Sequence, residues 1–162
     1  MGRAYREPVE RPRPPLAGDE KSMAVGRLAF MRATVAEKCA GLSDEQLKTR
    51  PVPTSELSLI GLVRHLTNMV ESRLLWYGGE EIPLTWGRHH FDVTDADPQS
   101  DLETWSERCA RGNAIAAAAA VDDVGAKGLS LRPVLSSLLY EYERHTGHMD
   151  ILRELIDGSV GE

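Results

Sequence analysis

The stretch from Ser130 to Gly158 reads SLRPVLSSLLYEYERHTGHMDILRELIDG and decides the predicted fold. Ser130 is a suitable helix N-cap, Pro133 lies in the first turn where proline is tolerated, and Gly158 gives a stop signal. With each residue turning the helix by about 100°, the apolar side chains gather on one face: Val134, Leu138, Leu152 and Ile156. The segment therefore predicts one long amphipathic helix that packs against other helices.

Three more segments have apolar residues spaced three or four apart, as amphipathic helices do. They cover residues 20–42, 59–77 and 100–120, and Gly78-Gly79 supplies a C-terminal stop for the second one. The sequence contains no strand alternation of useful length and no internal repeat. The pattern predicts an all-α protein with the architecture of a four-helix bundle.

The predicted bundle occupies residues 19–158, between a proline-rich arm at 1–18 and a short tail at 159–162. Proline density favours extended chain, so we expect the arm to lie as a strap across the core, with a PxxP-type ligand as the alternative. Residues 80–98 form a long loop between the second and third helices. A loop of that length leaves room for a crossover connection and is usually functional or mobile.

Composition excludes several classes of function. The 162 residues include 25 acidic and 19 basic side chains, and the net charge of −6 argues against binding to nucleic acid or to anionic lipid. The longest apolar run, Ala114–Val121, is far shorter than the ~20 residues that span a bilayer. Cys39 and Cys109 both fall on apolar helix stripes, which predicts core thiols in a reducing, cytoplasmic setting.

Polar side chains interrupt the apolar face of the last predicted helix. Glu141, His145 and His148 fall on that face, with His145 near its centre. Burying such groups without partners costs several kcal/mol, so something must compensate them. Glu141 and His145 are one turn apart, and His65 lies at the flank of the apolar stripe of the second helix. Together these three could hold a divalent ion such as Zn²⁺, Ni²⁺ or Fe²⁺.

The same residues could instead form a buried hydrogen-bond network without an ion. In that interpretation Glu141 would pair with Arg64 or Arg144, and the protein would be a non-catalytic bundle with a binding or structural role. Spacing alone leaves both interpretations open.

A resemblance to a known family bears on this choice. The stretch 142–154, YERHTGHMDILRE, resembles the final helix of the DinB-like metalloenzymes, in a branch related to mycothiol-dependent enzymes. The blocks GLVRHL at 61–66 and RPRPPLAGDE at 11–20 are similar to the second helix and the N-terminal arm of that branch. The resemblance covers most of the chain, and its most specific part is the Glu-x-x-x-His-x-x-His block at 141–148.

The resemblance implies a function and a role for each site residue. His65, Glu141 and His145 match the positions of metal ligands, and His148 would be a secondary group that could shuttle a proton. The implied activity is a thiol S-transferase or hydrolase-like reaction on a small molecule, with a low-molecular-weight thiol such as mycothiol. A homodimer is also implied. The chain departs from the branch at two positions. Pro133 stands where the branch often has Trp, and Ser137 stands where it often has His.

Other chemistry-bearing residues in the sequence give weaker signals. Adjacent His89 and His90 are expected to be exposed, because neighbouring side chains point apart. Trp86 could line a substrate mouth, although a packing anchor is the preferred interpretation. Trp76 and Trp105 are expected in the core. The cluster Asp92, Asp95 and Asp97 resembles part of a calcium loop but lacks its glycine and distal glutamate.

Overall fold

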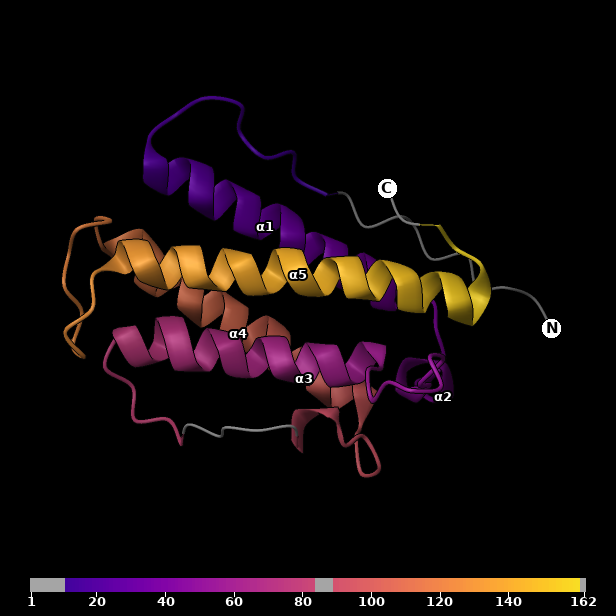
Figure 1. Ribbon diagram of the computed structural model, residues 1–162. Helices are drawn as coiled ribbons and strands as arrows, with labels where there is room; N and C mark the ends of the chain where they lie inside the picture. The colour runs from indigo at the N-terminus through magenta and orange to yellow at the C-terminus, as the bar shows by residue number, and fades with distance from the viewer. Residues whose placement is uncertain (1–10, 84–88, 161–162) are drawn as a thin grey trace.

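The computed structural model describes residues 11–83 and 89–160, which form an all-α structure (Figure 1). The bounds of its α-helices are α1 Glu20–Cys39, α2 Asp44–Lys48, α3 Leu59–Val70, α4 Pro98–Ala118 and α5 Leu131–Asp157. A π-helical turn, η1 (Glu71–Leu75), continues α3, and a 3₁₀ turn, η2 (His89–Phe91), precedes α4. The described residues contain no β-strand, which confirms the predicted all-α class, and they form five α-helices where the sequence predicts four main ones.

The long helices pack side by side. In Figure 1 α5 lies between α1 and α3, and α4 runs behind them in contact with α3. The described helices include none that is both long and apolar enough to cross a membrane. The packing places one face of α3 directly against α5, where the candidate ligands were predicted to meet.

Helix ends follow the sequence signals to within three residues: α1 ends at Cys39 instead of residue 42, and α4 ends at Ala118 instead of residue 120. A capping box of Ser43 and Gln46 begins α2. Helix α4 begins earlier than predicted, because Asp97 caps it and Pro98 occupies the first turn. Helix α5 has the predicted bounds, but the Ser130 side chain makes no capping hydrogen bond. None of these differences involves a residue of the candidate site.

The core is built around side chains that the last helix buries completely. Tyr142 is fully buried, and its hydroxyl accepts a hydrogen bond of 2.9 Å from Trp105 Nε1 and contacts Cys109 Sγ at 3.4 Å. Cys39 and Cys109 are both buried free thiols, as predicted. Trp105 is in the core as well, whereas Trp76 is only half-buried, with Lys127 Nζ 5.9 Å from the centroid of its ring.

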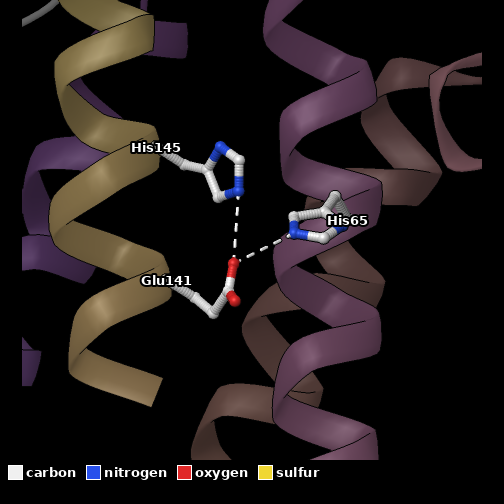
Figure 2. Close-up of side chains that lie close together, drawn as sticks. All are labelled: His65, Glu141 and His145. Carbon is white, nitrogen blue, oxygen red and sulfur yellow. Dashed lines mark hydrogen bonds and ion pairs between the residues drawn. The ribbon is translucent and has the colours of Figure 1, made fainter. Parts of the chain in front are cut away.

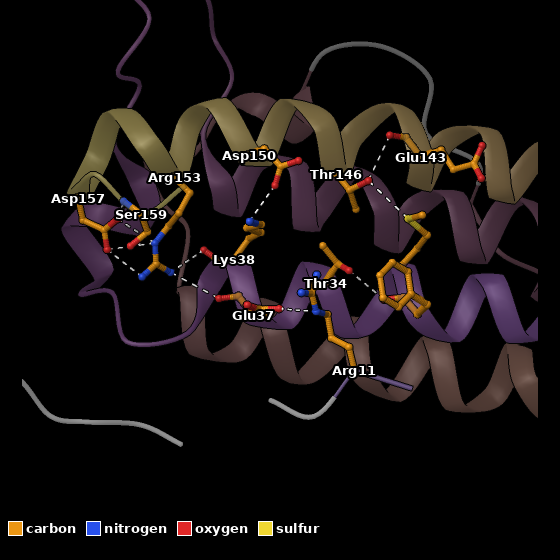
Figure 3. A network of polar contacts seen from close by, with 12 residues as sticks. Arg11, Thr34, Glu37, Lys38, Glu143, Thr146, Asp150, Arg153, Asp157 and Ser159 are labelled. Atoms are coloured by element: carbon orange, nitrogen blue, oxygen red, sulfur yellow. Dashed lines mark hydrogen bonds and ion pairs between the residues drawn. The ribbon is translucent and has the colours of Figure 1, made fainter. Parts of the chain in front are cut away.

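Polar contacts fix α1 along α5 (Figure 3). The buried Lys38 ammonium pairs with Asp150 at 2.8 Å, and Arg153 donates hydrogen bonds to the carbonyls of Lys38 and Ala40 at 3.0 and 2.9 Å. Those carbonyls belong to the last turn and the C-cap of α1, where backbone acceptors have no partner within the helix. Arg153 therefore joins the end of α1 to α5.

The described part of the arm, residues 11–18, packs against α1. Arg11 pairs with Glu37 at 2.9 Å, and its guanidinium lies 5.3 Å from the centroid of the Phe30 ring. Pro15 lies against Gly26, at a position where any larger side chain would collide with the proline ring. This part of the chain therefore lies as a strap.

Candidate metal site

Helices α3 and α5 bring three potential ligands to one point (Figure 2). One side-chain atom from each of His65, Glu141 and His145 lies within 4.8 Å of the other two. The Nε2 atoms of His65 and His145 lie 3.4 and 3.3 Å from the same carboxylate oxygen, Glu141 Oε2. Among the residues that the structure describes, this is the one cluster of three His, Cys, Asp or Glu side chains with such geometry.

The spacing of these atoms fits a metal ion. Ligand atoms that are ~2.1 Å from a tetrahedral ion are about 3.4 Å from each other. The two distances from the Nε2 atoms to Glu141 Oε2, 3.4 and 3.3 Å, are close to that value. A well-formed hydrogen bond from an imidazole N–H to the carboxylate would be shorter, ~2.7–3.2 Å. The donor set therefore has the chemistry and the spacing of a two-histidine, one-carboxylate site.

Electrostatics keep one of these imidazoles neutral. Burial and the nearby His65 lower the pKa of His145 to about 4, although the Glu141 carboxylate acts in the opposite direction. A neutral imidazole has a lone pair on one ring nitrogen, and that lone pair is what a metal ion binds. His145 is therefore ready to act as a ligand at neutral pH.

His148 contacts the back of the His145 ring. The Nδ1 atoms of the two rings are 3.2 Å apart, so one donates a hydrogen bond to the other. Metal-bound histidines usually donate from the second ring nitrogen to an acceptor that fixes the tautomer. With Nδ1 of His145 engaged in this way, its Nε2 faces Glu141.

The turn η2 lies against His65 from the other side. Phe91 stacks on the His65 ring with 5.6 Å between centroids, and the His90 ring lies edge-on at 5.8 Å. Arg50 and Arg64 hold the turn by donating to the carbonyls of Phe91 and Asp92, both at 2.6 Å. These contacts position the His65 ring.

The prediction that both loop histidines are exposed is wrong for one of them. His89 is exposed, but His90 is 8% exposed, and burial together with the neighbouring His89 lowers the pKa of His90 to about 4. Because η2 folds back onto α3, the second histidine points inward. Helical periodicity gives no signal for this contact, since residues 80–98 have none.

The alternative partners for the Glu141 carboxylate lie elsewhere. Arg64 is 3.9 Å from Asp101, and Arg144 donates to the hydroxyl of Tyr140 at 3.1 Å. The aspartates of the loop also have local roles: Asp92 accepts from Thr94, and Asp97 caps α4. Trp86 lies outside the described residues.

Of the two departures from the DinB-like pattern, Ser137 is one helical turn from a candidate ligand and Pro133 is two turns from it. Ser137, one turn before Glu141 on α5, accepts a hydrogen bond of 2.9 Å from Arg73 Nε. Pro133 is exposed in the first turn of α5. A hydroxyl and a guanidinium thus meet at the Ser137 position.

Comparison with known proteins places the chain in a family. A solved structure described as the conserved protein of locus from Enterococcus faecalis superposes with a TM-score of 0.68 at 16% identity, covering 88% of this chain and 100% of that chain. At that identity the match shows a shared fold alone. No curated protein matches the chain. The profile of the family described as Mycothiol-S-transferase matches residues 23–158, nearly the whole helical region, and the chain therefore belongs to this DinB-like family.

Proposed function

We propose that the protein is a divalent-metal-dependent S-transferase that joins a low-molecular-weight thiol of the mycothiol type to a small molecule. One observation carries the proposal: two imidazole Nε2 atoms lie 3.4 and 3.3 Å from a single carboxylate oxygen at the contact of α3 with α5. Membership of the mycothiol-S-transferase family supports a thiol as the substrate.

The residues that would hold the ion are His65, Glu141 and His145. A bound Zn²⁺, Ni²⁺ or Fe²⁺ would favour the thiolate form of a coordinated thiol, or a nucleophilic water in a hydrolase-like variant of the reaction. Three protein ligands leave a coordination position for such a group, as catalytic sites require.

The remaining residues of the site position the ligands and handle the proton. His148 engages His145 Nδ1 and so sets which ring nitrogen faces the ion. Because His148 is also half-buried rather than enclosed, its imidazole can exchange the proton released by a thiol with solvent. Phe91 keeps the His65 ring in place from the opposite side.

Elemental analysis of untagged protein, combined with a panel of thiols, tests this function. We expect about one divalent ion per chain, lost in His145→Ala and kept in His89→Ala, which removes an exposed imidazole. The loaded protein should then consume an electrophile only with a thiol of suitable structure. Wild-type protein without a bound ion, or unchanged metal content in His145→Ala, would support the non-catalytic polar network instead.

A further inference from the structure

A guanidinium and a hydroxyl lie next to the candidate ligands, at the contact between the continuation of α3 and the start of α5. Ser137 precedes Glu141 by one helical turn, which is roughly 6 Å along the axis. Arg73, in η1, donates from Nε to Ser137 Oγ at 2.9 Å. This hydrogen bond therefore holds the guanidinium at Ser137, which is one helical turn before Glu141 on α5.

The π-helical turn explains how Arg73 reaches this position. In a regular α-helix, eight residues beyond His65 would be turned about 80° away from it. Hydrogen bonds of the i→i+5 type widen the turn and reduce the rotation per residue, so η1 brings Arg73 back toward the side of the helix that holds His65. Such π-turns occur frequently at functional sites.

Several arginines of the molecule pair with a carboxylate, and among the described residues Arg73 does not. Arg108, Arg132 and Arg153 each pair with a carboxylate at 2.8 Å. Within residues 11–83 and 89–160, no carboxylate pairs with Arg73, and its Nη1 makes only long contacts of 3.4 and 3.5 Å to Ser72. The side chain is half-buried, so solvent shields its charge incompletely.

The chemistry of this pair selects its ligand. A guanidinium with a free edge binds a carboxylate through two parallel hydrogen bonds. Ser137 Oγ already accepts from Arg73, which leaves the hydroxyl proton available for donation to the same ligand. The pair thus offers several donors to one anionic group.

We propose that Arg73 and Ser137 form the carboxylate-binding part of the substrate site. This inference rests on the proposed function, since the reacting group would lie at His65, Glu141 and His145 while the acid group lies at Arg73. The rise from Ser137 to Glu141, roughly 6 Å along α5, is of the order of a small molecule with a few bonds between the two groups. The acid could belong to the thiol or to the electrophile.

Binding of mercapto acids to the zinc-loaded protein tests whether the thiol carries the carboxylate. The probes are HS-(CH₂)n-COOH with two to five methylene groups and the mercapto alcohols of equal length, measured by titration calorimetry. Because hydrogen bonds to charged groups are the strong ones, we expect wild-type protein to prefer the best-fitting acid about tenfold or more over its alcohol. Arg73→Gln should abolish that preference. Arg144→Gln, which removes an equal charge from the exposed side of α5, should keep it.

A second experiment tests whether the electrophile carries the carboxylate, with 2-mercaptoethanol as a neutral thiol. The probes are 4-(chloromethyl)benzoate and 4-(chloromethyl)benzamide, in which the sulfur–carbon bond forms as chloride leaves and the thiol proton passes to buffer. If the acid belongs to the electrophile, wild-type protein should consume the benzoate about tenfold faster, and Arg73→Gln should consume both at similar rates. The experiment that shows a preference dependent on Arg73 identifies which of the two reactants carries the carboxylate.

The controls separate this inference from the proposed function. Wild-type protein that binds no zinc would overturn both. If zinc and neutral thiols bind but neither experiment shows a preference for the acid that depends on Arg73, only the carboxylate site is overturned. Should Arg73→Gln fail to fold, Ser137→Ala takes its place. This variant removes one hydrogen-bond donor, so we expect the preference for the acid to fall severalfold. An unchanged preference in Ser137→Ala would again overturn the carboxylate site.

Discussion

The rings of His65 on α3 and His145 on α5 stand edge to face, with centroids 4.6 Å apart and planes at 74°. Both direct Nε2 toward the same oxygen of Glu141 (Figure 2). Since the two imidazoles come from different helices, folding alone creates this arrangement. An ion that binds here binds the folded chain and not the unfolded one, which couples metal affinity to stability.

Zinc should therefore raise the melting temperature of the metal-free protein. At a free concentration of 100 Kd, binding adds about 2.7 kcal/mol, which corresponds to roughly 5–10 °C for a domain of this size. Scanning calorimetry with and without a chelator measures the shift. Glu141→Gln should remove most of it, whereas Glu143→Gln, an exposed carboxylate on the same helix, should leave it intact. Equal shifts in both variants would contradict the assignment of Glu141.

His148 should matter for metal affinity without being a ligand. Loss of an outer partner of a metal-bound histidine typically costs about 10–100-fold in affinity, and His148 Nδ1 is 3.2 Å from His145 Nδ1. Competition titration of His148→Ala with a chromophoric chelator should show a decrease in this range, with His89→Ala as the control. His148→Gln should recover part of the loss because the amide can still accept a hydrogen bond. Wild-type affinity in His148→Ala would show that the contact has no role.

Sequence periodicity was sufficient for the helices and for one half of the site. The pattern of α5 puts Glu141 and His145 on the inward face, and the structure buries His145 and half-buries Glu141. Periodicity also offered His65 as a candidate at the flank of a stripe, where a single histidine is ambiguous, and the resemblance to DinB-like proteins favoured its role as a ligand. The ligand role of all three residues remains a prediction.

Two features near the site could not be read from the sequence. The π-turn η1 does not interrupt the apolar pattern of residues 59–77, so the displacement of Arg73 leaves no trace in it. The burial of His90 depends on Arg50 and Arg64, which tie η2 to the rest of the fold through backbone carbonyls. Side chains that bind backbone in a distant loop carry no periodic signal.

The thiol of Cys39 should make stability depend on alkaline pH. Burial raises the pKa of this thiol to about 12 from an ordinary value of 9.0. Because the folded state holds the proton more tightly, the contribution is fully present below pH 9 and is lost as pH rises toward 12. Urea unfolding at pH 8 and pH 10.5 should show a larger fall in the free energy of unfolding for wild type than for Cys39→Ala. Equal falls, or rapid reaction of the native thiol with a disulfide reagent at pH 8, would contradict the burial argument.

Gly26 and Gly147 are both helical glycines, and their surroundings predict opposite results for the same substitution. Nothing lies within 4 Å of the position that a Cβ of Gly147 would occupy, whereas a Cβ at Gly26 would lie 2.4 Å from Pro15 Cδ. Gly147→Ala should raise the free energy of unfolding by ~0.5–1 kcal/mol through helix propensity alone. Gly26→Ala gains the same propensity but must push Pro15 away from α1, so its net gain should be smaller.

Chymotrypsin cleavage after the exposed Leu16 should then become severalfold faster in Gly26→Ala than in wild type or Gly147→Ala. Identical cleavage rates in all three proteins would mean that the arm does not depend on the contact between Pro15 and Gly26.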